Sequence, residues 1–228
     1  FYSSNPTLTN ITIMNNSASN DGGGINCYYS SPTLTNVTIS NNLGGSGGGI
    51  YCTSSSSPTL TNVTISDNSS SGGYGGGIFI DSNANPTLTN VTITGNSSFL
   101  DGGGIYCASS SSPSLVNCIL WNDSPQEIYI ESGSVTATYS NIQGGWTGTG
   151  NIDADPLFSD TTNGDFTLQP TSTCIDAGDP DLDGDGEDYT TDVDDQDPDG
   201  TRIDMGAHYF DQTDVNIVSV TPDSLDFG

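Results

Sequence analysis

The residues best suited to chemistry in this chain are carboxylates near its C-terminal end. Residues 179–204 are dominated by Asp and Gly, and they include the run Asp181-Leu-Asp183-Gly-Asp185-Gly186-Glu187-Asp188-Tyr-Thr-Thr-Asp192. Asp at positions 1, 3 and 5, Gly at 6 and an acidic residue at 12 is the order of a calcium-binding loop, in which position 7 offers its backbone carbonyl. The predicted cofactor is calcium, and its predicted ligands are Asp181, Asp183, Asp185, Glu187 and Asp192.

A solvated acidic loop is the alternative to a calcium loop here. Position 12 is Asp192, where helix–loop–helix calcium sites prefer the longer Glu, and the flanks do not have helix composition. Carboxylates this dense nevertheless repel one another unless a cation is present. Arg202 is expected to be a structural partner of some of these carboxylates. A possible second site, with less regular spacing, consists of Asp194, Asp195, Asp197 and Asp199.

The region before these carboxylates repeats itself. Pro-Thr-Leu-Thr-Asn occurs at 6–10, 32–36, 58–62 and 86–90, a degenerate copy lies at 113–117, and Gly-Gly-Gly-Ile keeps the same interval. A fixed period of this length is typical of a solenoid. Each repeat has strand-like runs rich in β-branched residues, separated by Gly, Ser and Asn. The predicted fold is therefore all-β, a parallel β-helix with about 26 residues per turn.

Columns of equivalent residues predict the inside of this solenoid. Aliphatic columns, such as Leu8, Leu34, Leu60, Leu88 and Leu115, predict a narrow continuous core. Two columns are asparagine: Asn10, Asn36, Asn62, Asn90 and Asn117, and then Asn16, Asn42, Asn68, Asn96 and Asn122. We predict that the first asparagine column points inward and that its amides bond to one another along the axis.

The five cysteines cannot all pair within the chain. Cys27, Cys52 and Cys107 share one column with Ile80, which predicts small buried core residues with free thiols. A disulfide between Cys27 and Cys52, one turn apart, is the open alternative.

Composition excludes several classes of partner. The formal charge is −27, with a single Lys or Arg residue, which excludes a nucleic-acid binder and makes an anionic membrane surface an unsuitable partner. No run of 18 apolar residues exists that could insert into a membrane.

We expect regular repeats over 1–122, irregular last turns over 123–178 and an acidic calcium-binding cap over 179–210. Residues 211–228 are expected to form a linker and the start of an immunoglobulin-like module or an exchanged strand.

The repeats resemble the right-handed parallel β-helix of pectin-lyase-like proteins, especially Gly-rich bacterial surface proteins. The segments 151–158, 174–178 and 202–207 look like the end of the choice-of-anchor Q region that follows such β-helices. The resemblance implies an extracellular or cell-surface location in a secreted, multidomain bacterial protein. Lyases of this fold use Lys or Arg near calcium, and the repeats contain neither.

We predict a non-catalytic structural or adhesive module, a rigid calcium-stabilised stalk or fibre subunit. Hydrolases need converging carboxylates, whereas the repeat strands carry Thr and Ser and the repeat carboxylates fall in turns. One alternative is an enzyme or binding domain for acidic polysaccharide, and another is an ice-binding face of Thr-x-Thr rows such as Thr33 and Thr35. Expected partners are a glycan, another surface protein, or a second copy joined head to tail through the first turn and the C-terminal strand.

Overall fold

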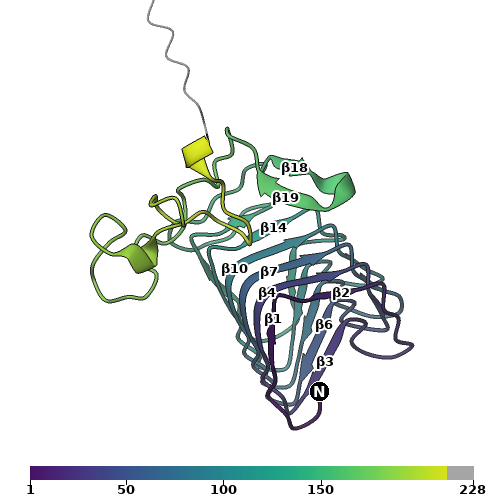
Figure 1. Ribbon diagram of the computed structural model, residues 1–228. Helices are drawn as coiled ribbons and strands as arrows, with labels where there is room; N and C mark the ends of the chain where they lie inside the picture. The colour runs from purple at the N-terminus through teal and green to yellow at the C-terminus, as the bar shows by residue number, and fades with distance from the viewer. Residues whose placement is uncertain (215–228) are drawn as a thin grey trace, which may run out of the picture.

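The computed structural model describes residues 1–214, which form a β-solenoid with three short 3₁₀ turns. Each repeat makes one turn, and each turn lies on the one before it (Figure 1). Thr7, Thr33, Thr59 and Thr87 pair in register, so successive turns contain 26, 26 and 28 residues. The predicted all-β solenoid of about 26 residues per turn is confirmed.

Three parallel sheets form the walls of the solenoid. The largest sheet contains β1 (Thr7–Thr9), β2 (Thr12–Met14), β4 (Thr33–Ser40), β7 (Thr59–Ser66), β10 (Thr87–Thr94), β13 (Ser114–Val116), β14 (Ile119–Trp121), β16 (Thr136–Thr138) and β17 (Asn141–Ile142). The second contains β3 (Ile25–Tyr28), β6 (Ile50–Thr53), β9 (Ile78–Ile80), β12 (Ile105–Cys107) and β15 (Ile128–Ile130). The third contains β5 (Leu43–Gly44), β8 (Ser69–Ser70) and β11 (Ser97–Ser98).

The remaining elements follow the regular turns. They are the antiparallel pair β18 (Phe158–Asp160) and β19 (Asp165–Leu168), and the 3₁₀ turns η1 (Thr161–Asn163), η2 (Val193–Asp195) and η3 (Gln212–Asp214). Within residues 1–214, no helix is long and apolar enough to cross a membrane. Most of the predicted immunoglobulin-like or exchanged strand falls on 215–228, outside the described residues.

The core is the predicted stack of aliphatic columns. Leu34, Leu60 and Leu88 are at most 1% exposed, and the neighbouring Thr side chains point outward because strand residues alternate between the two faces. All five cysteines are buried and free, which agrees with the predicted thiols, and Cys27 pairs in register with Cys52 without a disulfide. Each turn buries its apolar side chains only together with its neighbours, so stability is shared along the solenoid.

The inward asparagine ladder is the second column, so the prediction that the first column points inward was wrong. Asn42, Asn68 and Asn96 are at most 1% exposed, and Nδ2 of Asn42 and of Asn68 donates to Oδ1 of the next rung at 3.0 and 2.9 Å. Asn36 and Asn62, of the first column, lie at the surface with φ of 54° and 55°. This left-handed conformation bends the strand so that both Leu34 and Val37 can point inward, which turns the asparagine outward.

The last rung of the inner ladder is Asp123 rather than the predicted Asn122. Asn96 donates to Asp123 Oδ1, whereas Asn122 is exposed and its backbone N–H donates to Gln143 Oε1 at 2.8 Å. The turn that ends at Asp123 is one residue longer than the alignment on asparagine assumed, and this shift moves Asn122 out of the column.

The chain after the regular turns first adds to the solenoid and then returns along its face. Ile152 pairs with Asn141 and Ile142 of the last turn. Further on, Gly206 N donates to Asn117 O at 2.7 Å and Ala207 N donates to Thr92 Oγ1 at 2.9 Å. His208 Nε2 lies 2.9 Å from Thr64 Oγ1. The end of the acidic segment is therefore docked on three successive turns of the largest sheet.

Candidate metal centre

The acidic loop turns at Gly186 and is held by local side-chain hydrogen bonds. Gly186, at position 6, adopts φ +92°, a conformation that side chains other than glycine rarely adopt. Asp183 Oδ1 accepts a hydrogen bond from Asp185 N at 3.1 Å, and Asp185 Oδ1 accepts one from Glu187 N at 2.8 Å. These local bonds hold successive carboxylates in fixed directions, because each side chain closes a turn of its own backbone.

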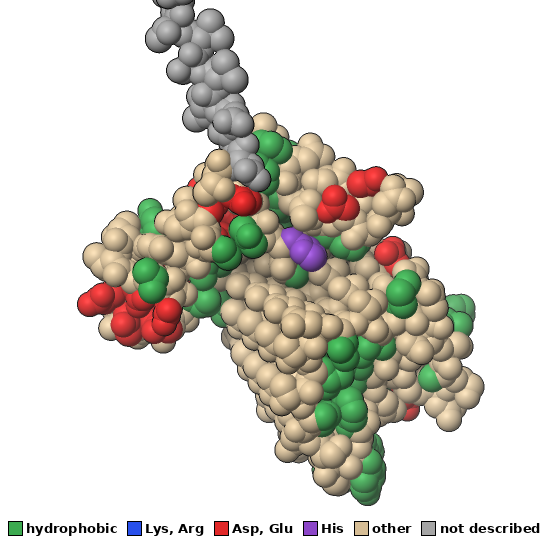
Figure 2. Space-filling model, viewed as in Figure 1, with side chains coloured by type: hydrophobic (Ala, Val, Ile, Leu, Met, Phe, Trp, Pro, Cys, Tyr) green, Lys and Arg blue, Asp and Glu red, His purple; other side chains and the backbone are tan. Residues whose placement is uncertain are grey.

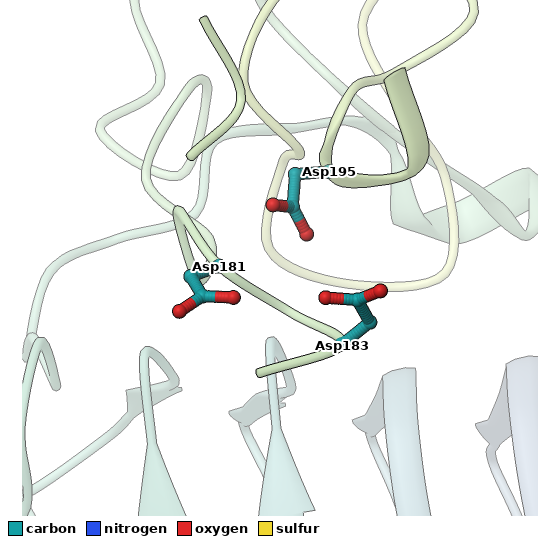
Figure 3. Close-up of side chains that lie close together, drawn as sticks. All are labelled: Asp181, Asp183 and Asp195. Atoms are coloured by element: carbon teal, nitrogen blue, oxygen red, sulfur yellow. The ribbon is translucent and has the colours of Figure 1, made fainter. Parts of the chain in front are cut away.

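Carboxylate oxygens converge in two overlapping groups. Asp181, Asp183 and Asp195, the inner triad, bring ligand oxygens within 4.8 Å of one another and point toward a common space (Figure 3). The outer triad contains Asp183, Asp185 and Asp192 at the same limit. Four of the five predicted ligands thus gather as side chains. Glu187, predicted to offer its backbone carbonyl, is exposed and its carboxylate lies outside both triads.

Asp195 is the residue that the loop pattern did not include. It lies in η2, whose preceding residue Asp192 accepts a hydrogen bond from Asp194 N at its side chain. Asp195 is fully buried, and its Oδ1 accepts from Leu182 N at 2.6 Å, whereas Oδ2 has no hydrogen-bond partner among residues 1–214. A buried carboxylate oxygen without a partner is costly, and a cation held with Asp181 and Asp183 would satisfy it. The residues therefore fit a metal ion.

The electrostatics of the inner triad agree with that fit. Burial raises the pKa of Asp195, and the negative charges of Asp192, Asp183 and Asp181 raise this pKa further. A divalent cation would reverse both effects, because it favours the charged form of each carboxylate. An all-oxygen set of this kind suits a hard cation such as calcium.

The other predicted acidic residues do not form a second cluster among residues 1–214. Asp197 Oδ2 accepts from Asp204 N at 2.9 Å, and Asp199 accepts from Thr201 N and Gln212 N. The carboxylates of Asp197 and Asp199 therefore hold the backbone of residues 201–212 by hydrogen bonds. Arg202, expected to be a structural partner of carboxylates, lies with its guanidinium carbon 5.7 Å from the centre of the Tyr139 ring. Burial raises the pKa of Asp179, and the positive charge of Arg202 opposes this rise.

A cleft of about 940 Å³ lies between the largest sheet and the acidic segment. Its floor includes Thr61, Asn62, Thr89 and Asn90, and its walls include Leu182, Asp194, Gln196, Asp197 and Tyr209. Figure 2 shows acidic side chains on the lobe beside the sheet, whereas uncharged polar side chains cover the sheet face. Leu182, Asp194 and Gln196 flank residues of the inner triad, so the candidate metal centre and the cleft wall share one piece of chain.

The threonine rows are in register, as their spacing predicts. Thr33 pairs with Thr59, and Thr35 pairs with Thr61. Thr61 and Thr89 nevertheless line the cleft beneath the acidic segment. This part of the threonine rows is therefore overhung rather than open and flat.

Comparison with known proteins bears on the fold. The family described as right handed beta helix region matches residues 1–155, which is more than half of the chain. The search of curated proteins and the search of solved structures returned no match. The chain belongs to the right-handed β-helix family.

Proposed function

We propose that this chain is a non-catalytic, calcium-stabilised rigid module of an extracellular bacterial surface protein. The observation that carries the proposal is the buried, unpartnered Oδ2 of Asp195 beside Asp181 and Asp183. Calcium bound there would join the loop at 181–183 to η2. It would thereby fix a segment that is docked on three turns of the solenoid through Gly206, Ala207 and His208.

The pairing of the solenoid supports its proposed role as a rigid spacer. Its strands pair in register without breaks from β1 to β16, and its buried amides bond from turn to turn. Extracellular calcium modules bind with dissociation constants of about 10⁻⁴ to 10⁻³ M, which suits a site that relies on few preformed ligands. The resemblance to secreted β-helix proteins supports the proposed location.

The test compares calcium-dependent stability in the protein and in the variant Asp195→Asn. A ligand that binds only the folded state stabilises it by about 2.7 kcal/mol at a concentration 100-fold above its dissociation constant. We expect the melting temperature of the protein to rise with calcium, and most of that rise to disappear in Asp195→Asn. Asp188→Asn is the matched control, because Asp188 lies in the same loop but is exposed and outside both triads.

A melting temperature that calcium leaves unchanged would rule out the calcium part of the proposal. Equal losses in Asp195→Asn and Asp188→Asn would show that general negative charge, rather than the inner triad, responds to the ion. Isothermal titration calorimetry with calcium chloride, and with magnesium chloride for comparison, measures the stoichiometry and the selectivity directly.

A second candidate function is the binding of a neutral glycan, and the cleft favours it. Hydroxyl and amide side chains on the floor and the partly exposed ring of Tyr209 on the wall suit a sugar chain. Acidic polysaccharide is a poorer candidate, because the carboxylate of Asp194 lines the same cleft and repels uronates.

Retention on immobilised polysaccharides tests this second function. We expect retention on a neutral polysaccharide that is reduced in Tyr209→Ala, and no new chain ends. The appearance of new chain ends would overturn the non-catalytic proposal. It would direct attention to the partly buried Asp197, because Asp204, the buried carboxyl beside it, has both oxygens occupied by the N–H groups of Asp176 and Phe210.

A further inference from the structure

The inner ladder obeys one hydrogen-bonding rule from rung to rung. Asn42 N and Nδ2 both donate to Asn68 Oδ1, at 3.0 Å each. Asn68 N and Nδ2 both donate to Asn96 Oδ1, at 3.0 and 2.9 Å. Asn96 N and Nδ2 both donate to Asp123 Oδ1, at 2.7 and 2.9 Å. Every rung that has a successor therefore supplies one backbone donor and one side-chain donor to it.

Asp123 continues the backbone half of this rule. Its N–H donates to Glu127 Oε1 at 3.0 Å, so Glu127 stands in the place of the next rung. The side-chain half requires a second donor, and an ionised carboxylate has none. Asp123 Oδ2 and Glu127 Oε2 are both buried and have no hydrogen-bond partner in the part of the chain that the structure describes.

The position of Asp123 Oδ2 matches that of the amide nitrogens in the earlier rungs. A Cβ atom built on Gly24 would lie 3.1 Å from Asn42 Nδ2, and one built on Gly49 would lie 3.2 Å from Asn68 Nδ2. A Cβ atom on Gly104, the equivalent glycine, would lie 2.6 Å from Asp123 Oδ2. An oxygen thus occupies the place where the ladder elsewhere has a donor.

We propose that Asp123 binds a proton on Oδ2 and donates it to Glu127, so that a carboxylic acid serves as the last amide-like rung of the ladder. The proton turns the orphaned Oδ2 of Asp123 into a donor to the Glu127 carboxylate, the role that the amide nitrogen has in the earlier rungs. Glu127 then carries the one negative charge of the pair, and two like charges in one buried place are avoided.

The surroundings of the pair are consistent with this assignment. Burial raises the pKa of Asp123 well above its usual value, and the hydrogen bond and charge of Glu127 raise it further. Burial also raises the pKa of Glu127, but its hydrogen bonds with Asp123 oppose that rise. The Asn96 amide and the Gly104 backbone, which also face Asp123, are neutral. Asp101 reaches the same turn only through Gln126 Nε2, at 3.4 Å.

The first test is the ¹³C chemical shift of the Asp123 carboxyl group as a function of pH. We expect the shift of a protonated acid at neutral pH. In parallel, Asp123→Asn supplies the amide that the ladder uses elsewhere. Because the folded-state pKa is raised, the proton stabilises the protein fully below the unfolded value of about 3.9, and this stabilisation is lost as the pH rises through the folded value. The melting temperature of Asp123→Asn minus that of the unmodified protein should therefore increase as the pH rises above about 4.

Two further variants test whether the effect belongs to Asp123 and Glu127. Asp153→Asn, at an exposed carboxylate outside the ladder, is the control for the loss of one negative charge. In Glu127→Gln the neighbouring negative charge is absent, so the titration midpoint of Asp123 should move to lower pH. An ionised Asp123 at neutral pH, or a stability difference between Asp123→Asn and the unmodified protein that does not change with pH, would overturn the proposal. An unchanged midpoint in Glu127→Gln would remove Glu127 as the acceptor.

Discussion

Asn68→Ala is the substitution for which the structure gives the clearest magnitude. Asn68 is fully buried, and its side chain donates to Ile39 O and Asn96 Oδ1 and accepts from Asn42 N and Nδ2. Its removal leaves the Asn42 N–H buried without a partner, at about 2 kcal/mol, and deletes further bonds worth about 1 kcal/mol each. We expect a loss of about 4 kcal/mol in the free energy of unfolding, or about 10 °C in melting temperature for a chain of this length.

The matched control is Asn62, which belongs to the first asparagine column, at the surface. Asn62 makes the same kind of amide-to-amide bonds, at 3.2 and 3.3 Å, but it is only partly buried, so water can replace its partners. Asn62→Gly removes that side chain without strain, because glycine tolerates φ 55°. We expect a loss below about 1 kcal/mol. Urea and thermal unfolding followed by circular dichroism give both values, and equal losses for the two variants would refute the argument that burial makes the inner ladder important.

Two other predictions concern a glycine and a histidine. In Gly49→Ala the new Cβ would lie 2.6 Å from Gly77 O, so we expect a loss of about 2 kcal/mol in unfolding measurements, whereas Gly72→Ala, in open space, should be nearly neutral. Burial lowers the pKa of His208, and the charge of Asp165 opposes this shift. The stability that neutral His208 contributes is therefore present above its pKa in the unfolded chain, about 6.5, and is lost as the pH falls through its pKa in the folded protein. Limited proteolysis from about pH 7 to about pH 5 should therefore cut the acidic segment more readily at low pH, and less so in His208→Asn; identical pH profiles would count against this contact.

The sequence was sufficient to predict the solenoid, because the core residues themselves recur with the repeat period. Leu34, Leu60 and Leu88 recur at the interval of one turn and are all buried, as expected for a solenoid whose turns share one core. It was not sufficient to choose between the asparagine columns, since both recur with the same spacing. That choice depends on the left-handed bend at Asn36 and its equivalents, which lets the strand present apolar residues on both sides of the asparagine.

The candidate metal centre was predicted in part for a similar reason. The loop spacing identifies Asp181, Asp183, Asp185 and Asp192, because a calcium loop is a local pattern. Asp195 enters the inner triad through the fold of η2 and its bond to Leu182 N, which the loop pattern does not contain. Likewise, nothing local shows that Asp123 replaces Asn122 in the ladder, because the shift arises from the longer turn before it.

The one-way bonding of the inner ladder gives the solenoid a polarity that its strands alone do not reveal. Each amide points its positive end toward the next turn, so the side-chain dipoles add along the axis from Asn16 to Asp123 and end at the negative charge proposed for Glu127. The two ends are therefore not interchangeable. A turn stacked before Asn16 would have to present donors to it, whereas Asp123 requires an acceptor, and Glu127 fills that place. The ladder therefore ends at Asp123, although β15, β16 and β17 continue the solenoid.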